Sequence, residues 1–459
     1  MPSAPRIAII GAGPSGFYAA EALQKTLPDV VIDLFDRLPT PFGLVRGGVA
    51  PDHPKIKSVT RIYDRIASHP GFRFFGHVTV GLDVTVPELH AAYHAVIIAT
   101  GAQTDRQLGI PGEQLAGSHA ATDFVGWYNG HPDFSDRRFD LTQHEAAVIG
   151  LGNVAIDVTR ILARDPETLA PTDLVSPALR ALHESALTSV HVIGRRGPVQ
   201  AACTTPELRE LGELEGVDAI VDPADLVLDP VSAAHLATGD DRTATKNMEI
   251  FRRWAERGPT GARRSIVFHF AASPVEVLGD ARVQGLRIVR NDLVPDDSGS
   301  VRAVPTNLVE TLDVGLIFRS VGYRGVPIDG VPFDDRRGVI PNAAGRVVDD
   351  AGEAVPGVYV CGWIKRGPSG VIGTNKSCAA DTVALLIDDL TTGVIDVARQ
   401  LGTAVDGLLL ARGARIVDWS GWQALDRAEI EAGASAGRPR EKVISVAEML
   451  DIVAAGNER

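Results

Sequence analysis

Two glycine-rich turns, each directly after an apolar run, constrain the fold of this chain more than any other feature. The first reads RIAIIGAGPSG over residues 6–16, and the second reads EAAVIGLGNVA over residues 145–155. In each, a strand-like run leads into the spacing G-x-G-x-x-G/A, and a helical pattern follows. Such strand–turn–helix units build parallel sheets. The sequence therefore predicts an α/β fold with two Rossmann-like dinucleotide-binding domains.

The first turn has a glycine at each position of the fingerprint, Gly11, Gly13 and Gly16. The first makes the tight turn, the second lets a pyrophosphate approach the backbone, and the third lets the helix pack on the strand. The phosphate then faces a helix N-terminus, which favours an anion. The next strand, VVIDLFD, ends at Asp36, whose carboxylate is predicted to accept hydrogen bonds from ribose hydroxyls. Asp33, inside that strand, is expected to be a lone polar residue facing an edge.

The second turn carries Gly150 and Gly152, with Ala155 in place of the third glycine. The strand after it, SVHVIGRR, ends in Arg195 and Arg196 where an NAD site would have an acid. Guanidinium groups bind the 2′-phosphate of NADP. Each charge-assisted contact is worth roughly 1.5–3 kcal/mol, so two favour NADP by roughly two to four powers of ten. The alternative is a solvated basic turn.

Each of the two strand–turn–helix units is followed further along the chain by another buried strand. These strands are HAVIIATG at 94–101 and DVGLIFRSVG at 313–322. This indicates that one domain is inserted in the other. We expect a discontinuous first domain of residues 1–106 and 325–459, and a second of residues 107–324. A hairpin is predicted around PDDSGS (295–300). The tail after residue 381 is expected to be mainly helical, with Trp419 and Trp422 as packing anchors.

The composition excludes several classes of protein. The 58 acidic residues outnumber the 45 basic ones, which argues against a nucleic-acid binder. No apolar run reaches the roughly 18 residues that span a bilayer, so no membrane association and a cytoplasmic location are predicted. Three scattered cysteines suit neither a disulfide framework nor a metal site, and are expected to be small buried residues.

A third glycine-dense stretch, GWIKRGPSGVIGTNKSCAADT, covers residues 362–382. A short strand leads into the loop, and a helix follows with Thr374 or Asn375 as its expected cap. This edge could direct N–H groups at the carbonyl oxygens and N1 of a flavin ring, with Trp363 stacking on the ring or lining it. A plain helix start is the alternative.

Together, six segments resemble the adrenodoxin-reductase-like NADPH–ferredoxin reductases. They are GAGPSGFYAAEAL, LPTPFGLVRGGVAPDHPKIK, GLGNVAIDVTRIL, VIGRRGPVQAACTTPELREL, IFRSVGYRGVPIDGVPFDD and GWIKRGPSGVIGTNKSCAADT. The resemblance covers the chain to about residue 385, and it is closest to the stand-alone actinobacterial enzymes. It implies that the first fingerprint holds FAD and the second holds NADP. Asp36 stands where many relatives have the longer Glu, which alters its reach but not its role.

The resemblance also implies the contacts of each cofactor. For FAD these are Ala12, Asp36, Leu44, Val80, Trp363 and the main chain of Gly370, Val371 and Ile372. For NADP they are Arg106, Leu151, Gly152, Asn153, Val154, Arg195, Arg196, Glu207 and Gly370. His53 and Glu210 lie in stretches that resemble the family's active site. They are candidates for positioning the nicotinamide or relaying a proton, with a purely structural histidine as the alternative for His53.

The implied activity is NADPH–ferredoxin oxidoreduction, with hydride passing from NADPH to FAD and two single electrons then passing to ferredoxin. Some relatives carry an N-terminal ferredoxin domain, and this sequence shows none, so a separate ferredoxin is expected. An acidic ferredoxin requires a basic patch on this acidic chain. The segment 242–264 is the candidate, and a solvated helix face is the alternative. Its basic residues are Arg242, Lys246, Arg252, Arg253, Arg257, Arg263 and Arg264, with Arg209 and Lys365 as possible additions.

Three other functions share parts of this pattern. A disulfide reductase has the same two-nucleotide plan, but the sequence contains no C-x-x-C pair. A flavin-dependent monooxygenase also uses FAD and NADPH, but its linking motif F-x-G-x-x-x-H is absent between the fingerprints. A non-catalytic NADPH-sensing flavoprotein would keep both cofactors without turnover. The last two stay open as alternatives.

Overall fold

The computed structural model describes residues 4–296 and 300–457, and the chain forms two compact units. The first unit comprises Met1–Thr104, Asn129–Pro132 and Gly322–Arg459, and the second comprises Asp105–Tyr128 and Asp133–Val321. The divisions fall two or three residues before the boundaries expected from the sequence. The short return of the chain to the first unit at Asn129–Pro132 was not predicted from the sequence. Strands β5 (Thr104–Asp105) and β15 (Tyr323–Arg324) lie where the chain passes from one unit to the other.

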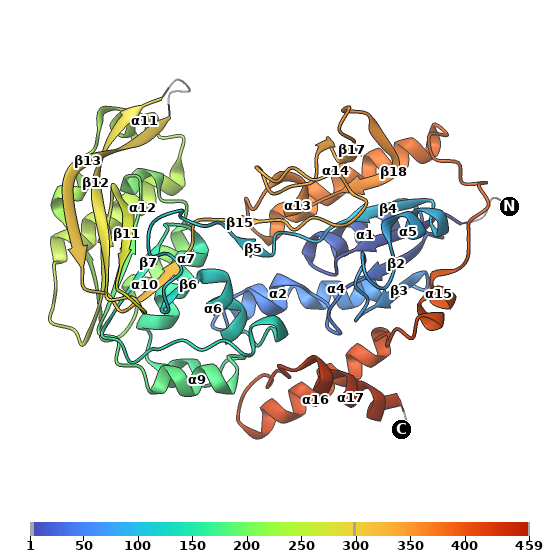
Figure 1. Cartoon of the computed structure of the whole chain (residues 1–459), viewed down its shortest axis with the longest axis horizontal. Helices are drawn as coiled ribbons and strands as arrows, with labels where there is room; N and C mark the ends of the chain where they lie inside the picture. Colours follow the sequence, from blue (N-terminus) through green and yellow to red (C-terminus); the bar gives the residue numbers. More distant parts are fainter. Residues whose placement is uncertain (1–3, 297–299, 458–459) are drawn as a thin grey trace. The chain divides into compact units, whose positions relative to one another are not determined.

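The first unit is built on a seven-stranded sheet in the order β16-β17-β18-β4-β1-β2-β3 (Figure 1). The five strands from β18 to β3 are parallel, and β16 and β17 pair antiparallel. The strands are β1 (Arg6–Ile10), β2 (Val31–Phe35), β3 (Phe72–Phe75), β4 (Ala95–Ile98), β16 (Asn342–Ala343), β17 (Arg346–Val348) and β18 (Ala354–Val360). The helices before the tail are α1 (Pro14–Thr26), α2 (Leu44–Gly47), α3 (Pro54–Lys57), α4 (Thr60–Ala67), α5 (Val86–Ala92), α13 (Trp363–Arg366) and α14 (Ile372–Thr391).

Strands β1 and β4 are buried on both faces, as their continuous apolar runs predict. In β1, Ile7 and Ile9 belong to one apolar core, whereas Ala8 and Ile10 belong to another on the opposite face. Helices α1 and α14 pack together on the first of these cores. The loops at the carboxyl ends of β1 and β18 therefore meet beside the N-termini of these two helices.

The second unit contains a parallel six-stranded sheet, in the order β6-β14-β7-β8-β10-β9, and an antiparallel sheet β11-β12-β13. The parallel strands are β6 (Ser118–Ala120), β7 (Glu145–Ile149), β8 (Ser189–Ile193), β9 (Val217–Val221), β10 (Arg264–His269) and β14 (Leu316–Arg319). The antiparallel ones are β11 (Ala272–Leu278), β12 (Gly285–Pro295) and β13 (Val301–Leu312). The helices are α6 (Ala121–Tyr128), α7 (Asn153–Ala163), α8 (Pro166–Leu169), α9 (Ser176–His183), α10 (Thr205–Gly212), α11 (Pro230–Thr238) and α12 (Arg242–Arg257).

The predicted hairpin is confirmed, because Pro295 at the end of β12 pairs with Val301 at the start of β13. Residues 297–299 at its tip lie outside the described part of the chain. The two sheets of parallel strands agree with the fold class predicted from the sequence. In each sheet, the glycine turn follows an interior strand, β1 in the first and β7 in the second. None of the described helices is long and apolar enough to cross a membrane.

The tail is helical, as predicted, and consists of α15 (Val405–Ala411), α16 (Trp419–Ser435) and α17 (Val446–Asn457). Within the first unit, helices α16 and α17 lie together on the side of β3 (Figure 1). Trp422 is buried and meets the Phe42 ring edge-on at 5.5 Å between centroids. Trp419 meets Phe42 in the same way at 6.2 Å, so both tryptophans anchor the tail to the core.

The expectation for Asp33 was wrong. Strand β2 lies inside the sheet, and the Asp33 side chain is completely buried. Its Oδ1 accepts a hydrogen bond from Arg73 Nε at 2.7 Å, and its Oδ2 accepts from Arg73 Nη2 at 2.6 Å and from the Tyr93 hydroxyl at 2.5 Å. Because strand β3 brings Arg73 beside it, the carboxylate is paired rather than exposed at an edge.

Replacing Asp33 with asparagine should destabilise the first unit by about 2–3 kcal/mol. Breaking a buried pair costs about 3–5 kcal/mol, and the partial exposure of Arg73 reduces that cost. Urea denaturation of the two proteins measures the difference. Glu88→Gln, which removes the surface pair with Arg412, is the control and should leave the denaturation midpoint close to that of the parent. Equal midpoints for Asp33→Asn and the parent would contradict this assignment.

Candidate functional site

The turn between β1 and α1 can be made only with glycine at its first and third fingerprint positions. Gly11 has φ +106°, and a Cβ there would lie 2.6 Å from the Ala99 carbonyl oxygen. A Cβ on Gly16 would lie 2.1 Å from the Gly11 carbonyl oxygen. At Gly13, by contrast, the nearest atom is the Gly43 Cα at 4.0 Å. The second glycine therefore faces open space, as a backbone approached by a pyrophosphate requires.

The start of α1 and the carboxylate of Asp36 both lie at this turn. Helix α1 begins at Pro14 with no side-chain cap, so its first N–H groups are available to an anion. The Asp36 Oδ2 accepts from Ala12 N at 2.8 Å, and Oδ1 accepts from Leu38 N at 3.0 Å. Burial raises the pKa of Asp36, and these N–H groups partly offset the rise. The carboxylate is thus fixed against the turn, and its remaining lone pairs can accept from hydroxyl groups.

The segment from Phe42 to Gly48 crosses this same turn. Phe42 has φ +83°, and its N–H donates to the Ala12 carbonyl at 2.7 Å. Gly43 has φ +47°, and a Cβ on it would lie 2.9 Å from Gly13 Cα. Leu44 follows directly at the start of α2 and is 37% exposed. Leu44 therefore stands beside the fingerprint, which is consistent with a cofactor contact.

The glycine-dense stretch after β18 also reaches this place. A Cβ on Gly362 would lie 2.1 Å from Ser15 Oγ, so this glycine packs directly on the first turn of α1. Trp363 donates from Nε1 to the Ser369 carbonyl at 3.1 Å, which fixes its indole ring. Exposed Val371 precedes the N-terminus of α14. Val80, a more distant candidate, is partly buried against the core that contains Phe35, the residue before Asp36.

The helix start in this stretch differs from the prediction. Helix α14 begins at Ile372, with Val371 as its N-cap residue, rather than after Thr374 or Asn375. Thr374 lies within the first turn and accepts a hydrogen bond from Val371 N at 3.2 Å. Asn375 accepts from Arg366 Nη2 at 3.0 Å. Gly370, with φ +79°, allows the chain to turn into the helix earlier than a polar cap would suggest.

The turn between β7 and α7 in the second unit repeats the first. Gly150 has φ +137°, and a Cβ there would lie 2.3 Å from the Ser320 carbonyl oxygen. Gly152 has no atom within 4 Å of the Cβ position, and Ala155 is completely buried. Helix α7 begins at Asn153 without a side-chain cap. This turn also presents open backbone and a helix N-terminus to an anion.

The predicted phosphate-binding arginines follow the neighbouring strand. Ile193 of β8 pairs in register with Ile149 of β7, so Arg195 and Arg196 lie just beyond the turn. Their carbonyl groups are held by Asn291 Nδ2 and Ala271 N, at 2.8 and 2.9 Å. Both side chains are exposed, and within residues 4–296 and 300–457 neither guanidinium makes a hydrogen bond or an ion pair. They are free to meet a dianion.

The remaining second-unit candidates converge on the same turn through Thr204. The Thr204 N–H donates to Asn153 Oδ1 at 2.8 Å, and its hydroxyl donates to Glu207. Leu151 packs on the backbone of Gly194, where a Cβ would lie 2.2 Å from Leu151 Cδ1. The turn 151–154 and Glu207 therefore lie together, and Arg195 directly follows the glycine on which Leu151 packs.

Three candidate site residues take no part in the contacts described above. Arg106 is exposed just inside the second unit. His53 immediately precedes α3 in the first unit, whereas Glu210 is on α10 in the second. The role of His53 and Glu210 in positioning the nicotinamide or relaying a proton stays a prediction.

One residue of this region was not found from the sequence. Arg160 of α7 is completely buried, pairs with Asp157 at 2.8 Å, and has its Nε 3.7 Å from the Glu210 carboxylate. The signal was present in VAIDVTRILA, where an aspartate and an arginine three positions apart interrupt an apolar helix. Such a pair on a buried helix normally marks an internal ion pair.

Comparison with known proteins agrees with this geometry. A family model described as pyridine nucleotide-disulphide oxidoreductase matches residues 5–196. The NADPH-ferredoxin reductase FprA of Mycobacterium leprae is 48% identical over 454 residues, covering 97% of this chain and 98% of that protein. The mitochondrial NADPH:adrenodoxin oxidoreductase of Salvelinus fontinalis is 42% identical over 475 residues, covering 99% and 92%.

A solved structure extends the likeness to the whole fold. Mycobacterium tuberculosis FprA in complex with NADPH superposes with a TM-score of 0.93 at 47% sequence identity, over 98% of this chain and 100% of that one. The sequence likeness, the fold and the two fingerprint turns all agree with the resemblance found in the sequence. This chain belongs to the adrenodoxin-reductase-like family of NADPH-ferredoxin reductases.

Proposed function

We propose that this chain is an FAD-dependent NADPH–ferredoxin reductase, in which the first unit holds FAD and the second holds NADP(H). The observation that carries the proposal is the pair of glycine turns, one in each unit, whose second glycines face open space. The acid after one turn and the arginines after the other distinguish the two nucleotides. When bound, FAD supplies the chemistry that splits a two-electron hydride transfer into single-electron transfers.

The residues of the first unit fit FAD. The N-terminus of α1 attracts the pyrophosphate, and Asp36 accepts hydrogen bonds from the ribose hydroxyls. Leu44, Trp363 and the main chain of residues 370–372 line the ring, where N–H groups at the start of α14 favour negative charge. These assignments are proposals supported by the convergence of four segments on one turn.

The residues of the second unit fit NADP(H). The turn at Leu151–Val154 presents N–H groups to the pyrophosphate, and Arg195 and Arg196 bind the 2′-phosphate. Glu207 accepts hydrogen bonds near the ribose, and its position is fixed by the Thr204 hydroxyl. His53 and Glu210 remain the proposed groups for orienting the nicotinamide or holding a proton.

The proposed reaction differs from the alternatives in what it requires. In a cytochrome c assay, NADPH should support rapid reduction only when a ferredoxin is added. A monooxygenase would instead consume NADPH and oxygen and yield an oxygenated product without ferredoxin. An NADPH-sensing flavoprotein would show no turnover in either assay.

A disulfide reductase is disfavoured by the state of the cysteines. Cys203, Cys361 and Cys378 are all buried and unbridged. Burial raises the pKa of Cys203 and of Cys361 to about 12, so neither thiol is a ready nucleophile.

Replacing both Arg195 and Arg196 with alanine should reduce the preference for NADPH over NADH by roughly two to four powers of ten, since two charge-assisted contacts are lost. The preference is the ratio of kcat/KM for the two coenzymes with ferricyanide as acceptor. Arg302→Ala, an exposed arginine of β13, is the matched control and should change nothing. An unchanged preference in the double variant would refute the assignment of the arginines.

The partner of this reductase is a ferredoxin, and we propose that it docks on the basic face of α12. Arg242, Lys246, Arg252 and Arg253 are exposed on this helix, while Met248, Phe251 and Trp254 pack inward. A cavity of about 330 Å³ opens at the start of α12. It is lined by Thr204, Thr205, Pro206, Arg209, Arg242, Thr243 and Lys246. Three cations around one cavity suit a carboxylate of an acidic partner.

Three of the basic residues considered from the sequence are engaged within the fold. Arg257 donates from Nη2 to the Ala219 carbonyl at 3.5 Å. Lys365 donates to the Ala344 carbonyl at 2.7 Å and to Thr382 Oγ1 at 3.0 Å, and is therefore a structural residue. Arg264 donates to the carbonyl oxygens of Ala163 and Arg164 at 3.0 and 2.8 Å. The proposed docking surface is therefore smaller than the run 242–264. The cytoplasmic location inferred from the sequence stays a prediction.

The double charge reversal Arg242→Glu and Lys246→Glu should raise the KM for ferredoxin at least about tenfold at low salt, because two attractive charges become repulsive. Turnover from NADPH to ferricyanide should stay at the parent value. Arg180→Glu on α9 is the control for a charge reversal outside α12. The docking proposal fails if both reactions slow equally, or if neither changes.

A further inference from the structure

The C-terminal helices are joined to the segment that crosses the first glycine turn by an ion pair that spans 383 residues of sequence. Arg46 of α2 donates from Nη1 to Glu429 Oε2 of α16 at 2.8 Å and from Nη2 to Oε1. The Glu429 side chain is completely buried, and that of Arg46 is 11% exposed. A bidentate pair in this environment fixes both the distance and the orientation of the two segments.

Glu429 is itself held rigidly. Its Oε1 accepts from Val443 N at 3.0 Å, and its Oε2 accepts from Arg440 Nη1 at 3.2 Å. Burial alone would raise the pKa of Glu429, but Arg46, Arg440 and the Val443 N–H outweigh it, and the net shift is downward. The carboxylate is therefore ionised and presents a fixed anion to Arg46 at neutral pH.

A series of contacts leads from Arg46 to the first glycine turn. The Arg46 guanidinium lies 5.4 Å from the centre of the Trp422 ring of α16, and that ring meets Phe42 edge-on. Phe42 in turn donates its N–H to the Ala12 carbonyl within the turn. Leu44, the proposed flavin contact, lies between Phe42 and Arg46, so the tail holds the chain on both sides of it.

A second contact fixes the continuation of this segment. Lys442 Nζ lies 3.4 Å from both the Arg46 carbonyl oxygen and Asn129 Oδ1. Asn129 Oδ1 also accepts from Lys57 Nζ of α3 at 3.1 Å. Asn129 and Lys442 are almost completely buried. The tail therefore also reaches α3, the helix that begins directly after His53.

We propose that Glu429 is a positioning residue of the flavin site, which acts through Arg46 to set the path of residues 42–48 over the first glycine turn. The C-terminal helices are then a working part of the FAD site and not only a cover for the core. This inference rests on the proposed function, since it assumes that the first unit holds FAD. It predicts that loss of the Glu429 charge weakens flavin binding while the fold persists.

The test compares Glu429→Gln with the parent as purified holoenzyme and after removal and return of FAD. The FAD dissociation constant should rise at least tenfold, and the shape of the visible flavin bands should change. The KM for NADPH should stay within twofold, because the second unit is untouched. Far-UV circular dichroism at the same temperature verifies that both proteins are folded, so a purely structural loss does not account for the shift.

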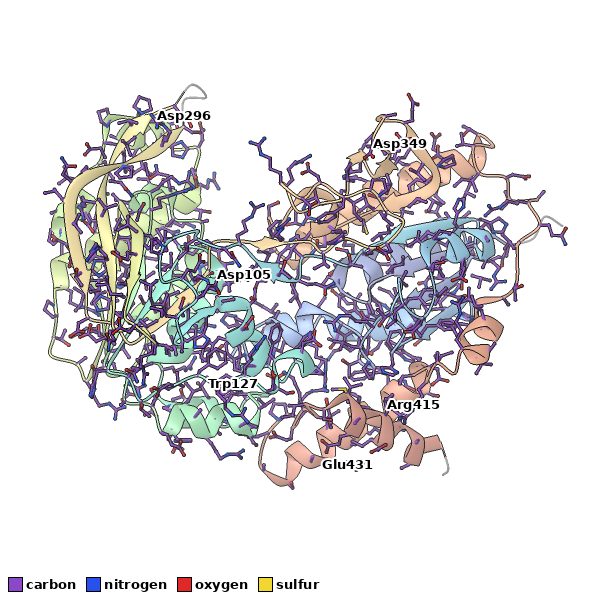
Figure 2. The ribbon with its side chains drawn as sticks, viewed as in Figure 1. Asp105, Trp127, Asp296, Asp349, Arg415 and Glu431 are labelled. Atoms are coloured by element: carbon purple, nitrogen blue, oxygen red, sulfur yellow. The ribbon has the colours of Figure 1, made fainter. Side chains whose placement is uncertain are left out.

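Helix α16 offers two matched controls. Glu431→Gln removes an equal charge from an exposed side chain two residues along the same helix, where Figure 2 labels it. Asp418→Ala removes the 2.8 Å N-cap hydrogen bond from Gly421 N at the start of the helix, which lowers its stability without touching Arg46, Arg440 or Glu429. Both controls should keep the FAD affinity and the flavin spectrum of the parent. If Asp418→Ala weakens FAD binding as much as Glu429→Gln does, the effect is general loosening and the inference is overturned.

Arg46→Lys provides the second variant in case Glu429→Gln does not fold. It keeps the charge but loses the planar fork, and should also weaken FAD binding and alter the flavin bands. Parent-like affinity and spectrum in either folded variant would overturn the positioning role. A parent protein that binds no flavin at all would instead refute the proposed function, so the two failures are distinguishable.

Discussion

The left-handed backbone at the first glycine of each fingerprint is the constraint on which the rest of the structure depends. Gly11 and Gly150 have φ values of +106° and +137°, and the Cβ of any other residue would collide with the carbonyl of Ala99 or Ser320, directly after the adjoining parallel strand. Without these turns, the helices α1 and α7 could not direct their uncapped N-termini at the edge of the sheet. The open N-termini of α1 and α7, which we propose as anion sites, follow from them.

Electrostatics then distinguishes two otherwise similar sites. An aspartate follows the strand beside the first turn, and two arginines follow the strand beside the second, and we propose that the first site accepts hydroxyls and the second a phosphate. The chain as a whole carries a formal charge of -13. Against that background, the exposed cations of α12 are a local concentration of positive charge, and we propose that it steers an acidic partner to one face.

Whether a prediction from the sequence was correct depended on whether neighbouring residues alone determine the structure at that position. The two turns, the buried strands and the helical tail were predicted correctly, because each is encoded within about twenty neighbouring residues. Asp33 was misjudged because its partners, Arg73 and Tyr93, come from other elements. Lys365 was offered for docking, but the Ala344 carbonyl and Thr382 hydroxyl bind it. The start of α14 was placed too late, because Gly370 rather than a polar cap sets it.

The sequence by itself determined the two nucleotide turns, the residues that follow their neighbouring strands, and the family, because short-range sterics and charge are written in consecutive residues. Only the tertiary structure decided that Glu429 meets Arg46, that Trp422 packs on Phe42, and that Asn129 returns to the first unit. No periodicity in the sequence predicts a contact between residues 383 positions apart. A buried ion pair is stable only where the completed fold brings both charges together and excludes water, so its partners are known once the fold is known.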